Sequence, residues 1–133
     1  MKIFLDANII FSAAKTDSAT RRFFEMLCSS GHILFTSEHA VEEAQRNLSL
    51  KRVQHLDGLS SILPEIKITK LSVELPELKM NENDKDLICS AFAIGCDVFW
   101  TGDKRHFGSY YGAEIHGVKV LSSVMLAELT INK

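Results

Sequence analysis

The stretch KIFLDANIIFSA, residues 2–13, decides the fold because it joins a strand to a helix through an acid. Asp6 and Asn8 are the only polar groups in an otherwise apolar run from Ile3 to Phe11. The segment KIFL is typical of a short buried strand, and NIIFSA is typical of a helix. The acid therefore lies at the carboxyl end of the first strand.

The rest of the chain continues this alternation of strands and helices. Strands separated by helices indicate an α/β fold with a mainly parallel sheet, in which ligands bind beyond the carboxyl ends of the strands. Further strands are predicted at HILFTS (32–37), IKITKL (66–71), DVFWT (97–101) and VKVLS (118–122). Helices are predicted over 18–31, 38–50, 51–63 and 83–95 and from Ser122 or Ser123 to Leu129, with loops over 74–83 and 102–112.

The composition is that of a soluble globular protein. With 133 residues, 46% of them hydrophobic and 24% charged, we expect one domain over residues 1–133. The apolar run that opens the chain stops at Asp6, too early for a signal peptide or membrane span, so we expect no membrane contact and a cytoplasmic location. Cys28, Cys89 and Cys96 lack CxxC spacing, which argues against a disulfide framework or zinc knuckle.

The charge balance limits the kind of nucleic-acid contact that is expected. A formal net charge of −2 argues against the uniformly basic surface of a DNA-packaging protein. It leaves room for a local basic rim around an acidic centre. A residue of this kind is more often an ordinary solvated charge, and the candidates for the rim are Arg21, Arg22, Arg46, Lys51, Arg52, Lys104 and Arg105.

Acidic residues gather where the sheet is expected to bind its ligand. Taken singly, each has a structural explanation as a helix cap, a first-turn acid, a solvated charge or a turn residue. Their common position at one edge of the sheet favours a functional role. The acids at that edge are Asp6, Asp103, the neighbouring Glu42 and Glu43, and Asp84 with Asp86.

Such a cluster indicates a metal site. Two carboxylates about 4 Å apart repel by roughly 1 kcal/mol in water and about 4 kcal/mol at an effective dielectric constant near 20. A divalent cation removes that cost, and Mg²⁺ or Mn²⁺ prefers the oxygen ligands that carboxylates supply. Such an ion meets substrate phosphates and activates water, so hydrolysis of a phosphodiester is the expected reaction.

The ordered motifs resemble the PIN-domain family. The segments that carry the likeness are FLDANIIFSA, TSEHAVEEAQRNL and NDKDLICSAFAIGCDVFWTGDKRHF. They are similar to the family's pattern of a strand ending in D-x-N, a mid-chain Glu, an Asp that opens a helix, and a strand ending in T-G-D. The likeness extends from Lys2 to about Leu129 and implies a three-layer α/β/α sandwich.

The resemblance also implies a ribonuclease that uses Mg²⁺ or Mn²⁺. Asn8 and Thr101 look like the polar residues that orient the acids or a bound water, and Asp86 is a supporting candidate. Position by position, the set that looks like the family's catalytic, metal-binding acids is Asp6, Glu43, Asp84 and Asp103.

Two of these assignments leave an alternative open. Glu43 is preferred to Glu42 by its spacing to a following leucine, although neighbouring helix residues point about 100° apart. Asp84 is preferred to Asp86 by its spacing to a small residue later in the same helix.

Many small PIN proteins resemble the VapC group, the toxins of toxin–antitoxin pairs. The likeness therefore implies an RNA substrate, a cognate antitoxin that blocks the active site and, as for other members, a homodimer. Arg46, Lys104 and Arg105 are the RNA-binding candidates.

Other functions remain open at this point. A PIN-like module that binds RNA or protein without cutting would not need the acids. Aspartyl-phosphate phosphatases and receivers also place an Asp after the first strand. The phosphatases, however, have a second Asp where this chain has Asn8, and both groups use a lysine where it has TGD. His106, beside Asp103, is either a phosphate contact or general acid, or a loop histidine without a chemical role.

Overall fold

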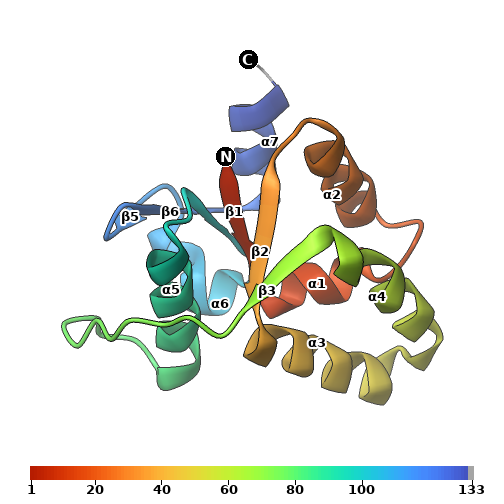
Figure 1. Ribbon diagram of the computed structural model, residues 1–133, viewed down its shortest axis with the longest axis horizontal. Helices are drawn as coiled ribbons and strands as arrows, with labels where there is room; N and C mark the ends of the chain where they lie inside the picture. The colour runs from red at the N-terminus through yellow and green to blue at the C-terminus, as the bar shows by residue number, and fades with distance from the viewer. Residues whose placement is uncertain (132–133) are drawn as a thin grey trace.

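The computed structural model describes residues 1–131, in which six strands form one sheet flanked by helices (Figure 1). The strands are β1 (Lys2–Leu5), β2 (Ile33–Ser37), β3 (Ile66–Thr69), β4 (Val98–Trp100), β5 (Glu114–Ile115) and β6 (Val118–Leu121). The α-helices are α1 (Ala7–Ala13), α2 (Ala19–Ser29), α3 (Glu38–Lys51), α4 (Leu56–Ile62), α5 (Glu82–Ile94), α6 (Lys104–Phe107) and α7 (Ser123–Ile131). Short 3₁₀ turns cover Val53–His55, Leu63–Glu65 and Gly108–Tyr110.

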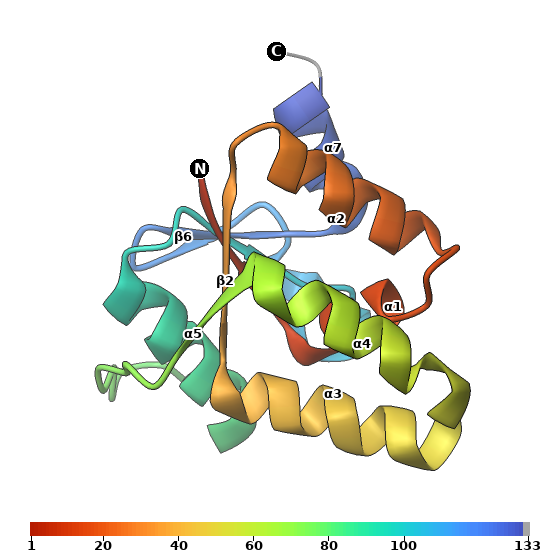
Figure 2. The same ribbon diagram turned by 45° about the vertical axis from the view of Figure 1, so that its right-hand side comes forward.

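The sheet has the mainly parallel arrangement that the sequence predicts. Its strand order is β3-β2-β1-β4-β6-β5, and every neighbouring pair is parallel except β5 with β6. Helix α5 lies on one side of the sheet, and α1, α2 and α4 lie on the other, as the two views in Figure 1 and Figure 2 both show. The α/β/α sandwich is therefore confirmed.

The strand order changes direction at β1, and this fixes where a ligand site belongs. From β1 the chain builds β2 and β3 on one side and then returns to place β4 on the other. In open α/β sheets, ligands bind at such a switch point, beyond the carboxyl ends of the strands. Leu5 of β1 is in register with Trp100 of β4, so the next residues, Asp6 and Thr101, come side by side.

Aromatic side chains from β4 attach helices to both faces of the sheet. The Phe99 ring stacks on Phe4, with ring centroids 5.8 Å apart, and lies 4.9 Å from the ring of Phe107 in α6. The Trp100 ring packs edge-on against Phe23 of α2, and its indole N–H donates to the Ser123 hydroxyl of α7 at 2.8 Å. Both aromatic residues of β4 are fully buried in the core.

Two parts of the chain differ from the sequence-based prediction. Residues 102–112, predicted as a loop, contain α6 and a 3₁₀ turn, because the Asp103 carboxylate caps α6 by accepting from the His106 N–H at 3.1 Å. Strand β5 was not predicted, since two residues are too few to show a strand period.

Arg21, a candidate for the basic rim, is instead buried in the structure. Its Nε donates to the Ala13 carbonyl at 2.7 Å, and its Nη2 donates to the Gly58 carbonyl at 2.9 Å and to the Ser61 hydroxyl at 3.1 Å. The guanidinium thereby joins the end of α1 to α2 and α4. This prediction was wrong because sequence alone does not show that backbone carbonyls will surround the charge.

Cys28, Cys89 and Cys96 are free thiols. None of the helices in residues 1–131 has the length and apolar character that crossing a membrane requires.

The close approach of α4 to α1 gives a first prediction. A Cβ atom added at Gly58 would lie 1.8 Å from the backbone oxygen of Ala14, which cannot move aside as a flexible side chain could. We expect Gly58→Ala to lower the free energy of unfolding by about 2 kcal/mol or more, although alanine favours helices. Denaturant unfolding followed by circular dichroism measures the change.

A matched substitution provides the control for this prediction. At Gly108 an added Cβ would have only ordinary contact, 3.7 Å from the Lys104 Cβ. Gly108→Ala should therefore stay within about 0.5 kcal/mol of the wild type. Equal stability of the two variants would contradict the close packing of α4 on α1.

Candidate functional site

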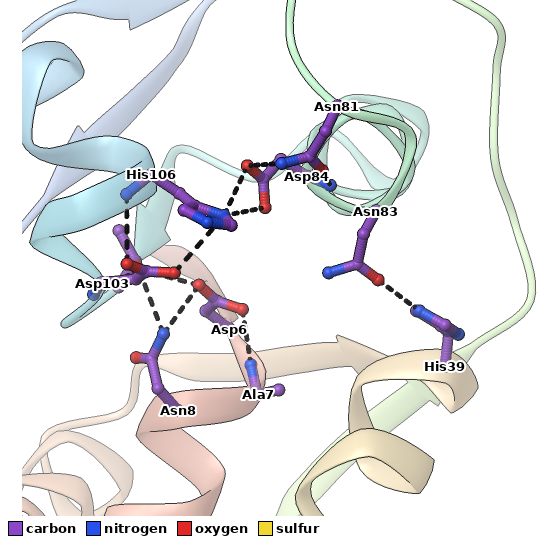
Figure 3. Close-up of polar contacts among 10 residues, drawn as sticks. Asp6, Ala7, Asn8, His39, Asn81, Asn83, Asp84, Asp103 and His106 are labelled. Carbon is purple, nitrogen blue, oxygen red and sulfur yellow. Dashed lines mark hydrogen bonds and ion pairs between the residues drawn. The ribbon is translucent and has the colours of Figure 1, made fainter.

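The site is built around the Asp6 carboxylate, which leaves the core at the end of β1. Its side chain is only 4% exposed and is held by three donors. The Ala7 N–H donates to Oδ1 at 2.7 Å, while the Thr101 hydroxyl and the Asn8 amide donate to Oδ2 at 2.8 and 3.0 Å (Figure 3). Asp6 is thus both the cap of α1 and a fixed, oriented carboxylate.

Asn8 and Thr101 connect Asp6 to the loop that carries Asp103. The Asn8 carbonyl oxygen accepts from the Gly102 N–H at 2.8 Å, and the Thr101 hydroxyl oxygen accepts from the Asp103 N–H at 3.0 Å. Thr101 is fully buried, so its hydroxyl cannot turn away to water. The TGD turn is therefore locked onto the first turn of α1.

Asp84 reaches the same edge from the first turn of α5. It is 5% exposed, and its neighbour Asn81 forms a reciprocal pair with it. The Asn81 carbonyl oxygen accepts from the Asp84 N–H at 2.9 Å, and the Asn81 amide donates to the Asp84 carboxylate, also at 2.9 Å. The positive end of the helix dipole further favours an acid at this position.

His106 lies between Asp84 and Asp103. Its Nδ1 is 3.0 Å from Asp84 Oδ2 and 3.7 Å from Asp103 Oδ2, and Figure 3 shows the imidazole pointing toward both carboxylates. The hydrogen bond and negative charge of Asp84, with the charge of Asp103 added, raise the pKa of His106. When protonated, this imidazole partly neutralises the two acids, and His106 belongs to α6 rather than to a loop.

Glu43, rather than Glu42, faces this cluster. Glu43 lines a hollow together with Asn8 and Asp103, and its charge helps to raise the pKa of Asp6. Glu42, one helical step away, is exposed and does not line the hollow. The remaining lining residues are Phe11, Asn47 and Lys51, and we refer to this space as the α1–α3 hollow.

The other predicted site residues lie farther from the cluster. Asp86 is exposed and lines a separate hollow with Ser37, His39 and Lys70, whereas Asp84 points into the cluster. The side chain of His39 is joined to Asn83 across this side of the site at 2.6 Å (Figure 3).

The three RNA-binding candidates occupy two positions. Lys104 and Arg105 are exposed in α6, directly after Asp103, and so lie at the rim of the cluster. Arg46 is exposed on α3 but does not line the α1–α3 hollow.

Sequence reasoning missed two groups that support the acids. Asn81 could have been found, because Asn is a preferred N-cap residue and stands here before a helix with acids in its first turn. Tyr111 donates from its hydroxyl to the Thr101 carbonyl at 3.0 Å, and burial, with the charges of Asp103 and Asp6, raises its pKa. No local signal marks Tyr111, because the loop after α6 folds back through tertiary contacts.

Comparison with known proteins rests on structure, since no family model and no curated protein matches the sequence. VapBC2 from Rickettsia felis, bound to a DNA fragment from its promoter, matches with a TM-score of 0.67 and 19% identity over 92% of this chain and 98% of that one. VapBC-1 from nontypeable Haemophilus influenzae matches with a TM-score of 0.58 and 14% identity, again over 92% of this chain and 98% of that one. Mycobacterium tuberculosis VapC20, a toxin that cleaves the sarcin–ricin loop, matches with a TM-score of 0.52 and 13% identity over 80% of this chain and 94% of that one.

The chain has a VapC-like PIN fold. This confirms the resemblance read from the sequence motifs and accounts for nearly the whole chain. At identities below 20% the likeness concerns the fold, so the chemistry of the site has to be argued from its own residues.

The donor set at the edge of this VapC-like fold suits a hard divalent cation. The converging groups are carboxylates with an amide and a hydroxyl, all of them oxygen donors of the kind that Mg²⁺ and Mn²⁺ prefer. Within residues 1–131, however, no three acidic, histidine or cysteine side chains are already arranged around one ligand position. His106 lies beside Asp84 and Asp103, and its imidazole adds a positive charge there when it is protonated.

Ionisation of the Asp6 carboxyl group is unfavourable in the folded protein. Burial is the main cause that raises its pKa from 3.8 to about 6, against the three hydrogen bonds that lower it, and Glu43 adds a smaller rise. A buried carboxylate that is costly to ionise is the kind of group whose charge a bound cation would stabilise.

The raised pKa of Asp6 predicts a pH dependence of stability in metal-free buffer. Between pH 3.8 and about 6 the folded protein holds a proton that the unfolded chain releases, so the free energy of unfolding falls as the pH rises through this window. Below this pH window the free energy of unfolding is not reduced, and above the window the reduction is complete and amounts to up to about 3 kcal/mol. Asp6→Asn should remove it and be more stable than the wild type at neutral pH.

Urea unfolding in EDTA across this pH range measures the effect. Asp17→Asn is the control, because the Asp17 side chain is 80% exposed and should leave the wild-type profile unchanged. If Asp6→Asn followed the wild-type profile as well, Asp6 would not be a carboxylate with a raised pKa.

Proposed function

We propose that this protein is a Mg²⁺- or Mn²⁺-dependent endoribonuclease, active as a single domain over residues 1–133. The observation that carries the proposal is the convergence of acids from four elements at the switch point of a VapC-like sheet. The proposed catalytic and metal-binding residues are Asp6, Glu43, Asp84 and Asp103.

The proposed chemistry follows from the oxygen ligands. A bound Mg²⁺ or Mn²⁺ would act as a Lewis acid toward an RNA phosphodiester and make water a stronger nucleophile. Asp6, Asp84, Asp103 and Glu43 would hold it, since each presents a carboxylate toward the shared edge or the α1–α3 hollow.

The chain's own hydrogen bonds give this site its rigidity. Asn8 and Thr101 hold the Asp6 Oδ2 atom and the TGD turn at the same time, so the distance between two acids does not depend on a flexible loop. Such fixed charges lower the reorganisation that a reaction would otherwise require. Lys104 and Arg105, at the rim, are proposed to contact phosphates of the RNA.

We also propose that the protein acts as the toxin of a type II toxin–antitoxin pair. The structural neighbours VapBC2 and VapBC-1 support a protein partner, and the VapC20 neighbour, which cleaves the sarcin–ricin loop, supports an RNA substrate. An antitoxin would then act by covering the acidic edge.

The ribonuclease proposal predicts metal-dependent cleavage. Purified protein should cut single-stranded or structured RNA with Mn²⁺ or Mg²⁺ and stop in EDTA. Asp6→Asn or Asp103→Asn should lower the rate by at least about 100-fold, the loss typical for one group that stabilises transition-state charge. Gel analysis of a labelled RNA measures the rate, and circular dichroism verifies the fold.

The outcome separates the enzyme from a binding module. Asn is as good a helix cap as Asp, so Asp103→Asn should keep α6 in place. Cleavage in EDTA, or full activity of both variants, would contradict the mechanism, and RNA binding without cleavage would favour a non-catalytic PIN-like module.

Neighbouring acids offer matched pairs that test the ligand set. Glu43→Gln and Asp84→Asn should weaken Mn²⁺ binding, measured by isothermal titration calorimetry, by about tenfold or more, as expected when a ligand or its support is lost. Glu42→Gln and Asp86→Asn should bind Mn²⁺ like the wild type, because both residues are exposed outside the cluster. If the variant of Glu42 or Asp86 lost more Mn²⁺ affinity than the variant of its paired acid, the metal ligand would be reassigned to that residue.

A further inference from the structure

The α1–α3 hollow extends from the acidic cluster toward the far end of α3. Its volume is about 400 Å³, within the usual range of small-ligand pockets, which is about 300–1,000 Å³. The acids Glu43 and Asp103 line it together with Asn8, and Phe11, Asn47 and Lys51 complete its wall. The latter three have no part in holding a cation.

Two helices present these side chains in regular rows. Phe11 follows Asn8 by three residues on α1, so both lie on the same face of that helix. Glu43, Asn47 and Lys51 follow one another at four-residue spacing along α3. Eight residues of helix span about 12 Å, so the row leads from an acid to a cation over that distance.

The three side chains differ in chemistry and are available to a ligand. The Phe11 ring is partly buried against the core, which holds it in place. Asn47 is partly buried on the hollow's wall. Lys51 is exposed, and the ion pairs formed within residues 1–131 involve other cations.

We propose that the α1–α3 hollow binds the unpaired RNA nucleotide next to the phosphate that is cut. The base stacks on Phe11, the Asn47 amide hydrogen-bonds to it, and Lys51 contacts a backbone phosphate. This inference rests on the proposed ribonuclease function, because the acidic cluster defines where the cut phosphate lies.

The composition of the hollow favours single-stranded RNA over a duplex. Proteins bind unpaired nucleotides with an aromatic ring, hydrogen-bonding side chains and a basic group along the backbone. Base pairs inside a helix present no free face to a ring in a hollow. When an RNA strand enters the hollow, Lys51 would attract a phosphate at one end of the hollow. The acids at the other end would repel a phosphate until a cation is bound.

Binding measurements on an inactive protein test this inference. Full-length Asp6→Asn, in Mg²⁺, is titrated into a short fluorescein-labelled single-stranded RNA of mixed sequence and followed by anisotropy. Adding Phe11→Leu should weaken binding about tenfold, the order of one base stack, while Phe11→Trp should restore it and show tryptophan quenching by the RNA. Lys51→Gln should lower the slope of log K against log salt by about 0.7–1.

Two surface variants provide the controls. Lys67→Gln removes an exposed cation on β3, and Gln45→Ala changes an exposed amide on α3, both outside the hollow. Both should bind RNA like the parent, whereas Asn47→Ala should bind severalfold more weakly. Circular dichroism melts verify folding, and if Phe11→Leu fails to fold, Lys51→Gln and Asn47→Ala decide the test.

The possible failures are distinguishable. If the wild type cleaves RNA but the Phe11, Asn47 and Lys51 variants bind like their controls, the nucleotide subsite is wrong and the ribonuclease proposal stands. If the wild type neither cleaves nor binds the RNA, both are wrong. If the Phe11, Asn47 and Lys51 variants lost as much affinity for a duplex RNA of the same sequence as for the single strand, the assignment to an unpaired base would be overturned.

Discussion

The burial of the Asp6 carboxylate is the constraint on which the site depends. Strand β1 carries it from the core to the edge of the sheet, where desolvation raises its pKa to about 6 despite three hydrogen bonds. A fold that only needed a helix cap would gain from a neutral Asn at this position, since Asn caps equally well. The unfavourable ionisation of Asp6 therefore supports the proposed role of this acid in binding a cation.

Three of the four acids that we propose as catalytic also take part in capping a helix. Asp6 caps α1, Asp103 caps α6, and the Asn81–Asp84 pair closes the start of α5. Asp6 and Asp103 follow β1 and β4 directly, whereas Asp84 is placed by the start of α5, so helix capping and the placement of these carboxylates are achieved together. A capping role for these side chains is therefore compatible with the catalytic role that we propose for the same acids.

The sequence predicts those features that depend on local pattern. Strands, helices and the acids at strand ends follow from periodicity and from the topology of parallel sheets. The choice between Glu43 and Glu42 depends on packing, because a step of one residue turns a helix by about 100°. The burial of Arg21, the short β5 and the position of His106 between two acids arise from tertiary contacts that no local pattern contains.

The net charge of the chain is small, but acidic and basic side chains occupy separate positions across the site. The carboxylates gather at the ends of β1 and β4, while Lys104 and Arg105 lie at the rim and Lys51 lies at the far end of the α1–α3 hollow. A polyanion near this surface meets attraction at its margins and repulsion at its centre, and only a bound cation reverses the latter. Because the acids and Lys51 are carried by packed helices and strands, this separation is built into the fold, and in the proposed ribonuclease it would position a phosphate before any reaction takes place.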